Sequence, residues 1–138
     1  TIGEQEKLDA HTLQILELAA VVHDIACPIC REKYGNTDGK KQELESPPLV
    51  EDFFAEYLRN AQVSAQDAER ISWLVAHHHT YTNVDGLDYQ ILLEADFLVN
   101  AGESAYSESA IESAKKNVFK TSAGTRLLEL IFENRQQK

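Results

Sequence analysis

The stretch LELAAVVHDIA, residues 16–26, decides the fold of this chain. Its apolar residues recur at helical spacing and also fill the rest of the helix circumference, so the stretch predicts a helix that runs through a core rather than over it. His23 and Asp24 stand side by side near the end of this helix. Because burying a charged group without a partner costs several kcal/mol, the pair requires a partner or a ligand.

The bulk composition bounds the kind of protein. With 138 residues the chain is long enough for one hydrophobic core, and we expect a single domain over residues 1–138. The sequence contains no methionine, so a native segment before Thr1 is also considered. Only two cysteines occur, which excludes a disulfide scaffold.

The charge balance predicts the class of partner. Against 23 Asp and Glu residues stand 13 Lys and Arg residues, for a formal net charge of -10. This charge repels a phosphate backbone, so we expect no nucleic-acid polymer and no membrane surface as a partner. No run approaches the roughly 18 consecutive apolar residues of a membrane helix, and the amino terminus lacks the pattern of a signal peptide. We therefore expect a cytoplasmic protein, and a homodimer stays open.

The apolar spacing is helical nearly throughout and predicts an all-α fold, a helical bundle of about five to six helices. The first helix is expected from Asp9, as its N-cap, to about Cys27, followed by a loop over residues 28–45. Ser46 with Pro47 and Pro48 predicts the next helix start, because proline in the first turn loses no hydrogen bond.

The later helices have start signals of their own. Ser64, with Asp67 three residues on, predicts the start of a helix over residues 65–79. Asp88 is expected to cap a helix over residues 89–100. Two amphipathic helices are expected at about residues 107–119 and 122–134.

Two further groups of polar residues interrupt apolar helices. Asp96 stands within YQILLEADFLVN, residues 89–100, and His77, His78 and His79 end the helix before it. On a helical projection of about 100° per residue, His78 faces the core, His79 is marginal, and His77 lies outside or at a rim.

His23, Asp24, Asp96 and His78 thus project from apolar helices, which is how helical bundles build metal sites in their interior. Imidazole and carboxylate ligands suit a divalent ion such as manganese, iron, cobalt, magnesium, zinc or nickel. An open position on such an ion can hold a water, lower its pKa and neutralise an arriving phosphate. A small anionic substrate is therefore compatible with the acidic chain.

These residues resemble the HD-domain superfamily of metal-dependent phosphohydrolases. The resemblance covers roughly residues 16–100 and rests on three blocks in order, LELAAVVHDIA, LVAHHHTY and LLEADFLVN. It implies a helical bundle of the HD type that hydrolyses a small phosphoester, such as a nucleotide or a related phosphate. It also implies His23, Asp24 and Asp96 as metal ligands, and His78, with His79 or His77, as residues that serve either a second metal or the substrate phosphate. On the second alternative His78 is the catalytic residue, and His77 and His79 bind the substrate.

Two departures from the family pattern leave a second interpretation open. The family has a further histidine one helix before the His-Asp pair, whereas His11 lies only 12 positions before His23, about 18 Å along the same expected helix. Some members also have a histidine where QELESPPLVED, residues 42–52, offers Glu43 or Glu45. The alternative is a catalytically inactive HD-type module that binds a nucleotide or a metal for regulation, and the simplest one is a helical interaction domain without an ion.

Two other motifs were weighed as sites. CPIC, residues 27–30, has the C-x-x-C spacing of redox or zinc sites, but it follows a helix rather than a strand, so ordinary loop residues are the favoured interpretation. FKTSAGTR, residues 119–126, places backbone N–H groups at a helix start, where phosphate binds in other proteins. An ordinary capped helix is the favoured interpretation there.

Overall fold

The computed structural model describes residues 1–57 and 63–133, and every regular element in them is helical. The all-α prediction is confirmed. The described residues form α1 to α8, more than the five to six helices expected. They divide into two compact units, one of residues 1–13 and 83–138 and one of residues 14–82, and each is described by itself.

The first unit contains α1 (Ile2–Gln5), α6 (Leu87–Glu103), α7 (Glu108–Asn117) and α8 (Ser122–Leu128), which continues into a π-helical turn, Glu129–Glu133. Helix α1 contacts both α6 and α8, and α6 contacts α8. Ala114, Phe119 and Leu128 form a buried cluster against which Phe97 and Phe132 pack. Aromatic burial of this kind dominates the stability of a small core.

A buried carboxylate joins α6 to the start of α8. Glu94 is 0% exposed and accepts hydrogen bonds from the Thr121 hydroxyl at 2.6 Å and from the Gln90 amide at 2.6 Å. Two backbone N–H groups, of Lys120 and Thr121, donate to the same carboxylate at 3.2 Å each. Charge-assisted bonds of this number compensate for the loss of hydration, so Glu94 is a structural residue.

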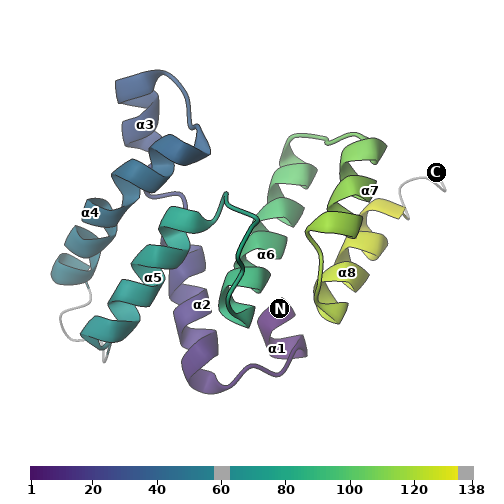
Figure 1. Ribbon diagram of the computed structural model, residues 1–138, viewed down its shortest axis with the longest axis horizontal. Helices are drawn as coiled ribbons and strands as arrows, with labels where there is room; N and C mark the ends of the chain where they lie inside the picture. Colours follow the sequence, from purple (N-terminus) through teal and green to yellow (C-terminus); the bar gives the residue numbers. More distant parts are fainter. Residues whose placement is uncertain (58–62, 134–138) are drawn as a thin grey trace. The chain divides into compact units, whose positions relative to one another are not determined.

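The second unit contains most of α2 (Ala10–Val22), α3 (Cys27–Tyr34), α4 (Gly39–Tyr57) and α5 (Ala65–His77). Helices α4 and α5 lie side by side, and α3 packs against α4 (Figure 1). The buried apolar residues of this unit include Ala19 on α2, Cys30 on α3, Val50 on α4 and Leu74 on α5. One apolar face of each helix therefore turns inward, as the helical periodicity predicts.

The predicted first helix and the loop after it are wrong in their bounds. Helix α2 ends at Val22 rather than near Cys27, and the predicted loop over residues 28–45 contains α3 and the first part of α4. Helix α3 forms because Pro28 stands in its first turn, where its missing N–H is harmless, and because Gly35 ends it in the left-handed conformation at φ 73°. Only residues 35–38 connect α3 to α4.

The predicted helix start at Ser46 is also wrong, because α4 runs from Gly39 through Pro47 and Pro48. Asp38 precedes the helix, and its carboxylate accepts a hydrogen bond from the Lys40 N–H at 2.9 Å. The two prolines deprive the carbonyl groups one turn earlier, at positions 43 and 44, of their helical donors. The Leu44 side chain is exposed, so on that side of the helix water can take the place of the missing donors.

The predicted caps are largely confirmed. The Asp9 carboxylate accepts from the Thr12 N–H at 3.1 Å, and Ser64 accepts from the Asp67 N–H at 3.1 Å. Ser107, for which no cap was predicted, caps α7. Asp88 is not the cap of α6, because the helix begins at Leu87 after Gly86. A polar side chain that accepts the orphan N–H groups of a first turn is a local signal, which is why it can be read from sequence.

One segment, residues 10–34, is long and apolar enough by composition to pass for a membrane span. In the structure it is α2 and α3, separated by a turn at residues 23–26. Leu16 and Ala19 on α2 are buried, as in the core helix of a folded domain. This segment is therefore weak evidence for a membrane location.

Candidate metal centre

The turn after α2 positions the His-Asp pair. Helix α2 ends at Val22, and the Ile25 N–H returns to the Val22 carbonyl at 3.0 Å. His23 is the first residue of this turn, and its Nδ1 lies 2.6 Å from the carbonyl oxygen of Ala20. The last carbonyl groups of a helix lack intrahelical donors, so a histidine at this place satisfies one of them.

His78 occupies the equivalent place at the end of α5. It is the C-cap residue, and its Nδ1 lies 2.6 Å from the carbonyl oxygen of Val75. The predicted inward orientation of His78 is confirmed, because the residue is 1% exposed. Since a carbonyl oxygen only accepts, Nδ1 carries the hydrogen in both rings, and a neutral ring then presents a bare lone pair at Nε2.

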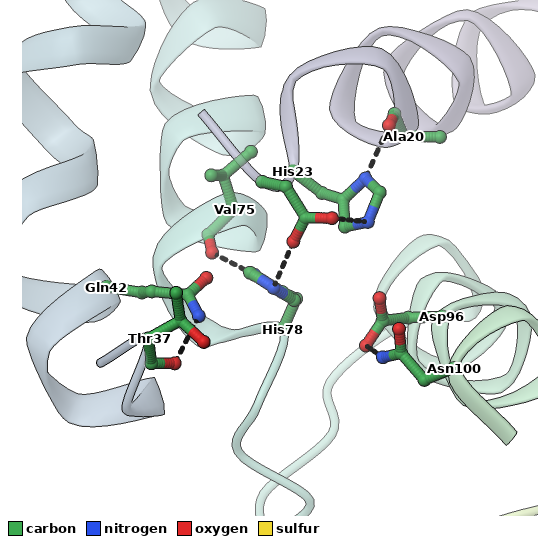
Figure 2. A network of polar contacts seen from close by, with 9 residues as sticks. Ala20, His23, Thr37, Gln42, Val75, His78, Asp96 and Asn100 are labelled. Carbon is green, nitrogen blue, oxygen red and sulfur yellow. Dashed lines mark hydrogen bonds and ion pairs between the residues drawn. The ribbon is translucent and has the colours of Figure 1, made fainter. Parts of the chain in front are cut away.

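Both Nε2 atoms turn to one carboxylate, that of Asp24 (Figure 2). His23 Nε2 lies 3.0 Å from Oδ2, and His78 Nε2 lies 3.7 Å from Oδ1. The two imidazole rings meet edge to face, with centroids 5.4 Å apart. Two lone pairs and an anion thus converge, and this arrangement is repulsive unless a positive charge is present.

The lowered pKa of Asp24 also indicates that a positive charge lies beside its carboxylate. The hydrogen bond to His23, followed by the proximity of His78 Nε2 at 3.7 Å, holds the pKa of Asp24 well below its usual range, against the opposing effect of partial burial. Because each Nδ1 hydrogen is already donated to a carbonyl, such a bond requires a second proton on the ring. Either imidazolium protons or a bound cation can supply that charge.

The atoms fit a divalent metal ion. Ligand nitrogen and oxygen atoms about 2.1 Å from an ion lie about 3 to 3.5 Å from one another. The separations of 3.0 Å and 3.7 Å in this cluster are close to that range. A backbone carbonyl that fixes the Nδ1–H of a metal-binding histidine is also the usual support of such ligands. His23 Nε2 and Asp24 Oδ2 are therefore spaced like two ligands of one ion, and His78 Nε2 faces the other oxygen of the same carboxylate.

The other two histidines flank this cluster. His77 stacks on Trp73 with ring centroids 4.1 Å apart, and its Nε2 lies 3.4 Å from Oε1 of Glu43. His79 packs against His78, with ring centroids 4.0 Å apart. The prediction that His77 lies at a rim is confirmed, since 27% of its side chain is exposed.

Glu43 and Glu45, which stand where some HD-domain proteins have a histidine, have different contacts in the structure. Glu43 reaches His77, as described above. Glu45 accepts hydrogen bonds from Tyr34 at 2.7 Å and Lys33 at 3.2 Å, between α3 and α4. Tyr34 and then Lys33 lower the pKa of Glu45, which marks it as a member of a surface ion pair. Only Glu43 contacts the histidine group among these two.

Asp96 lies on α6 in the first unit, where it is buried and accepts a hydrogen bond from Asn100 at 3.2 Å. His23, Asp24 and His78 belong to the second unit. The role of Asp96 as a further metal ligand therefore stays a prediction.

The other two candidate motifs both lie at helices, so the expectation of loop residues for CPIC is wrong. Cys27 and Cys30 lie on α3 as free thiols, and burial followed by the charge of Asp24 raises the pKa of Cys27 to about 11, which disfavours thiolate chemistry. The N-terminus of α8 already binds two carboxylates of the chain, those of Glu94 and of Glu6, which accepts from the Ala123 N–H at 2.7 Å. The favoured interpretation of a capped helix is confirmed there.

Searches against protein-family models, curated proteins and solved structures find no match to this chain.

Proposed function

We propose that this chain is a metal-dependent phosphohydrolase of the HD type that acts on a small phosphoester, such as a nucleotide or a related phosphate. The observation that carries the proposal is the convergence of two imidazole Nε2 atoms on the Asp24 carboxylate, at 3.0 Å and 3.7 Å, with both Nδ1–H groups donated to backbone carbonyls. The three sequence blocks that resemble HD-domain proteins support the same activity.

His23 and Asp24 are proposed to hold a divalent ion, with Asp96 as the third ligand that the sequence predicts. When bound, such an ion supplies an activated water and neutralises charge on the phosphoryl group. Asp24 is suited to this role because its pKa is held below its usual range, so it stays an anion at neutral pH.

His78 is the proposed catalytic residue. Its ring is buried and fixed by the Val75 carbonyl at 2.6 Å, and its Nε2 is the atom turned toward Asp24. A proton held at Nε2 can be donated to an oxygen of the phosphoester. His77 and His79, on either side of it, are proposed to bind the substrate.

The test is hydrolysis of a panel of phosphomonoesters and nucleotides with Mn²⁺, Fe²⁺, Co²⁺, Mg²⁺, Zn²⁺ or Ni²⁺ added in turn. We expect at least one pair of metal and substrate to be turned over, and Asp24→Asn to lower kcat by at least about 100-fold, because the variant loses a charged ligand. Glu45→Gln is the matched control, since Glu45 bonds Tyr34 and Lys33 instead. It should keep full activity.

Two other outcomes decide against this function. Metal and nucleotide binding without any hydrolysis would favour the regulatory module. No metal uptake, measured on protein purified without an affinity tag, would favour a helical interaction domain whose histidines cap helix ends.

A further inference from the structure

The buried face of α4 carries two polar side chains that the proposed function does not use. Gln42 is 3% exposed and Ser46 is 1% exposed, and they lie one turn apart in line with buried Val50. A core position in a helix is ordinarily apolar, so two successive polar residues there require a cause.

The orientation of the Gln42 amide is fixed by chemistry. Its Nε2 donates to the carbonyl oxygen of Thr37 at 2.7 Å, and because a carbonyl only accepts, the amide cannot be reversed. Among the residues the structure describes, neither Gln42 Oε1 nor Ser46 Oγ has a hydrogen-bond partner. Buried oxygens of this kind are bound by water or by a ligand in folded proteins, since leaving them unbonded is costly.

Two neighbours of Gln42 on α4 approach the residues at the end of α5. A Cβ atom on Gly39 would lie 2.8 Å from the Cβ of His79, and Glu43 Oε1 lies 3.4 Å from His77 Nε2. In the sequence Gln42 lies between Gly39 and Glu43. Likewise, His78 lies between His77 and His79. Figure 2 shows the amide end of Gln42 directed from α4 toward His78.

We propose that Gln42 and Ser46 bind a hydroxyl group of the substrate, which makes them specificity residues. The proposal rests on the proposed function, because it places the phosphoester at the neighbouring His23, Asp24 and His78. An amide oxygen only accepts, so Gln42 Oε1 requires an O–H or N–H donor and is unsuited to a phosphate oxygen. Ser46 can accept from or donate to the same hydroxyl.

The test uses substrates that differ by one hydroxyl group: adenosine 5′-monophosphate and its 2′-deoxy and 3′-deoxy forms, with Mn²⁺. We expect the wild-type protein to prefer the full nucleotide over one deoxy form by at least about 10-fold in kcat/KM, since a buried acceptor left unbonded rejects the analogue. Gln42→Leu should reduce that preference to about twofold or less, by lowering kcat/KM only for the hydroxylated substrate.

Gln90→Leu is the matched control. Gln90 is also a buried glutamine, but its amide bonds Glu94 at 2.6 Å and the Val118 carbonyl at 2.7 Å in the first unit. This variant should lose stability and keep the preference. Ser46→Ala, which removes a single oxygen, gives the test a second variant in case Gln42→Leu does not fold, and we expect it to reduce the preference as well.

Binding constants for the same three nucleotides, measured by calorimetry with Mn²⁺, separate this proposal from the proposed function. Nucleotides that bind with the same preference but are not hydrolysed would sustain the role of Gln42 and end the hydrolase proposal. Equal binding constants of the wild-type protein for all three nucleotides, or no binding of any of them, would overturn the role of Gln42. An unchanged preference in both Gln42→Leu and Ser46→Ala would overturn it as well.

Discussion

Two carboxylates, one in each unit, illustrate opposite uses of an acidic group in an apolar helical protein. Glu94 is completely buried and accepts hydrogen bonds from two side chains and two backbone N–H groups. The side chain of Asp24 is 55% exposed and faces two imidazole nitrogens, which are lone pairs in the neutral rings and N–H groups only in the protonated rings. Donors fixed by the fold satisfy the Glu94 carboxylate, whereas the charge at Asp24 is balanced either by protons on the imidazole rings or by a bound cation.

The two carboxylates also differ in how accessible they are to a ligand. A Cβ atom on Gly124 would collide with Glu94 Oε1, so the Glu94 site is closed by the backbone of α8. His23 and Asp24 line a depression with Val21 and Phe53 in the second unit. A ligand can therefore reach Asp24, and the comparison predicts which residues govern stability and which govern binding.

The largest effect is expected from Glu94→Ala. The variant leaves the Thr121 hydroxyl, the Gln90 amide and two backbone N–H groups without their acceptor, and we expect the free energy of unfolding to fall by about 3 to 5 kcal/mol. Chemical denaturation of the wild type and the variant measures the change. A loss below about 1 kcal/mol would show that the network is not structural.

The next effect concerns metal affinity. Asp24→Asn should weaken Mn²⁺ binding by at least about 100-fold in calorimetry, while the unfolding free energy of the metal-free protein changes by less than about 1 kcal/mol, because Asp24 is largely exposed. Asp96→Asn tests the prediction made from the sequence, and we expect a similar loss of affinity. Unchanged affinity in that variant would remove Asp96 from the site and leave the His23, Asp24 and His78 cluster intact.

The pH dependence of Mn²⁺ binding sharpens the comparison. The pKa of Asp24 is lowered, so its carboxylate stays ionised from neutral pH well into the acid range and its contribution to folding is lost only at still lower pH. Protons therefore compete with the metal for imidazole nitrogens rather than for the carboxylate. We expect affinity to fall about 10- to 100-fold from pH 7.5 to pH 5.5. An affinity that does not depend on pH in this interval would contradict histidine ligation.

The last prediction concerns a local effect on the reactivity of Cys27. Burial and then the charge of Asp24 raise the pKa of this thiol to about 11 from an ordinary 9.0, so its alkylation by iodoacetamide at pH 8 should be about 100-fold slower than that of an exposed cysteine. Mn²⁺ bound at Asp24 should offset the carboxylate charge and accelerate the reaction. Mass spectrometry distinguishes Cys27 from buried Cys30. No change on adding Mn²⁺ would argue against an ion at Asp24.

The parts of the fold that depend on local chemistry could be predicted from the sequence. The caps at Asp9 and Ser64, the inward side of His78 and the helical nature of the described elements follow from side chains within one turn of each other. The helix start predicted from Pro47 and Pro48 was wrong, because both prolines lie inside α4. Proline is tolerated at a helix start and also in an exposed helix interior, since in neither place does a buried carbonyl lose its donor.

The candidate site was predictable only where its residues interrupt an apolar pattern. His23, Asp24 and His78 have that signal, but Glu94 has it as well, two positions before Asp96, and is structural. Its partner Thr121 is 27 residues away, and no local periodicity indicates such a contact. Gln42 had no sequence signal, because its helix was expected to be a loop.

The most direct measurement is an anomalous diffraction map of crystals grown with Mn²⁺, collected at the manganese absorption edge. We expect a peak about 2.0 to 2.3 Å from His23 Nε2 and from an oxygen of Asp24. Crystals without a peak at these atoms, at a Mn²⁺ concentration that saturates the protein in solution, would contradict the metal centre.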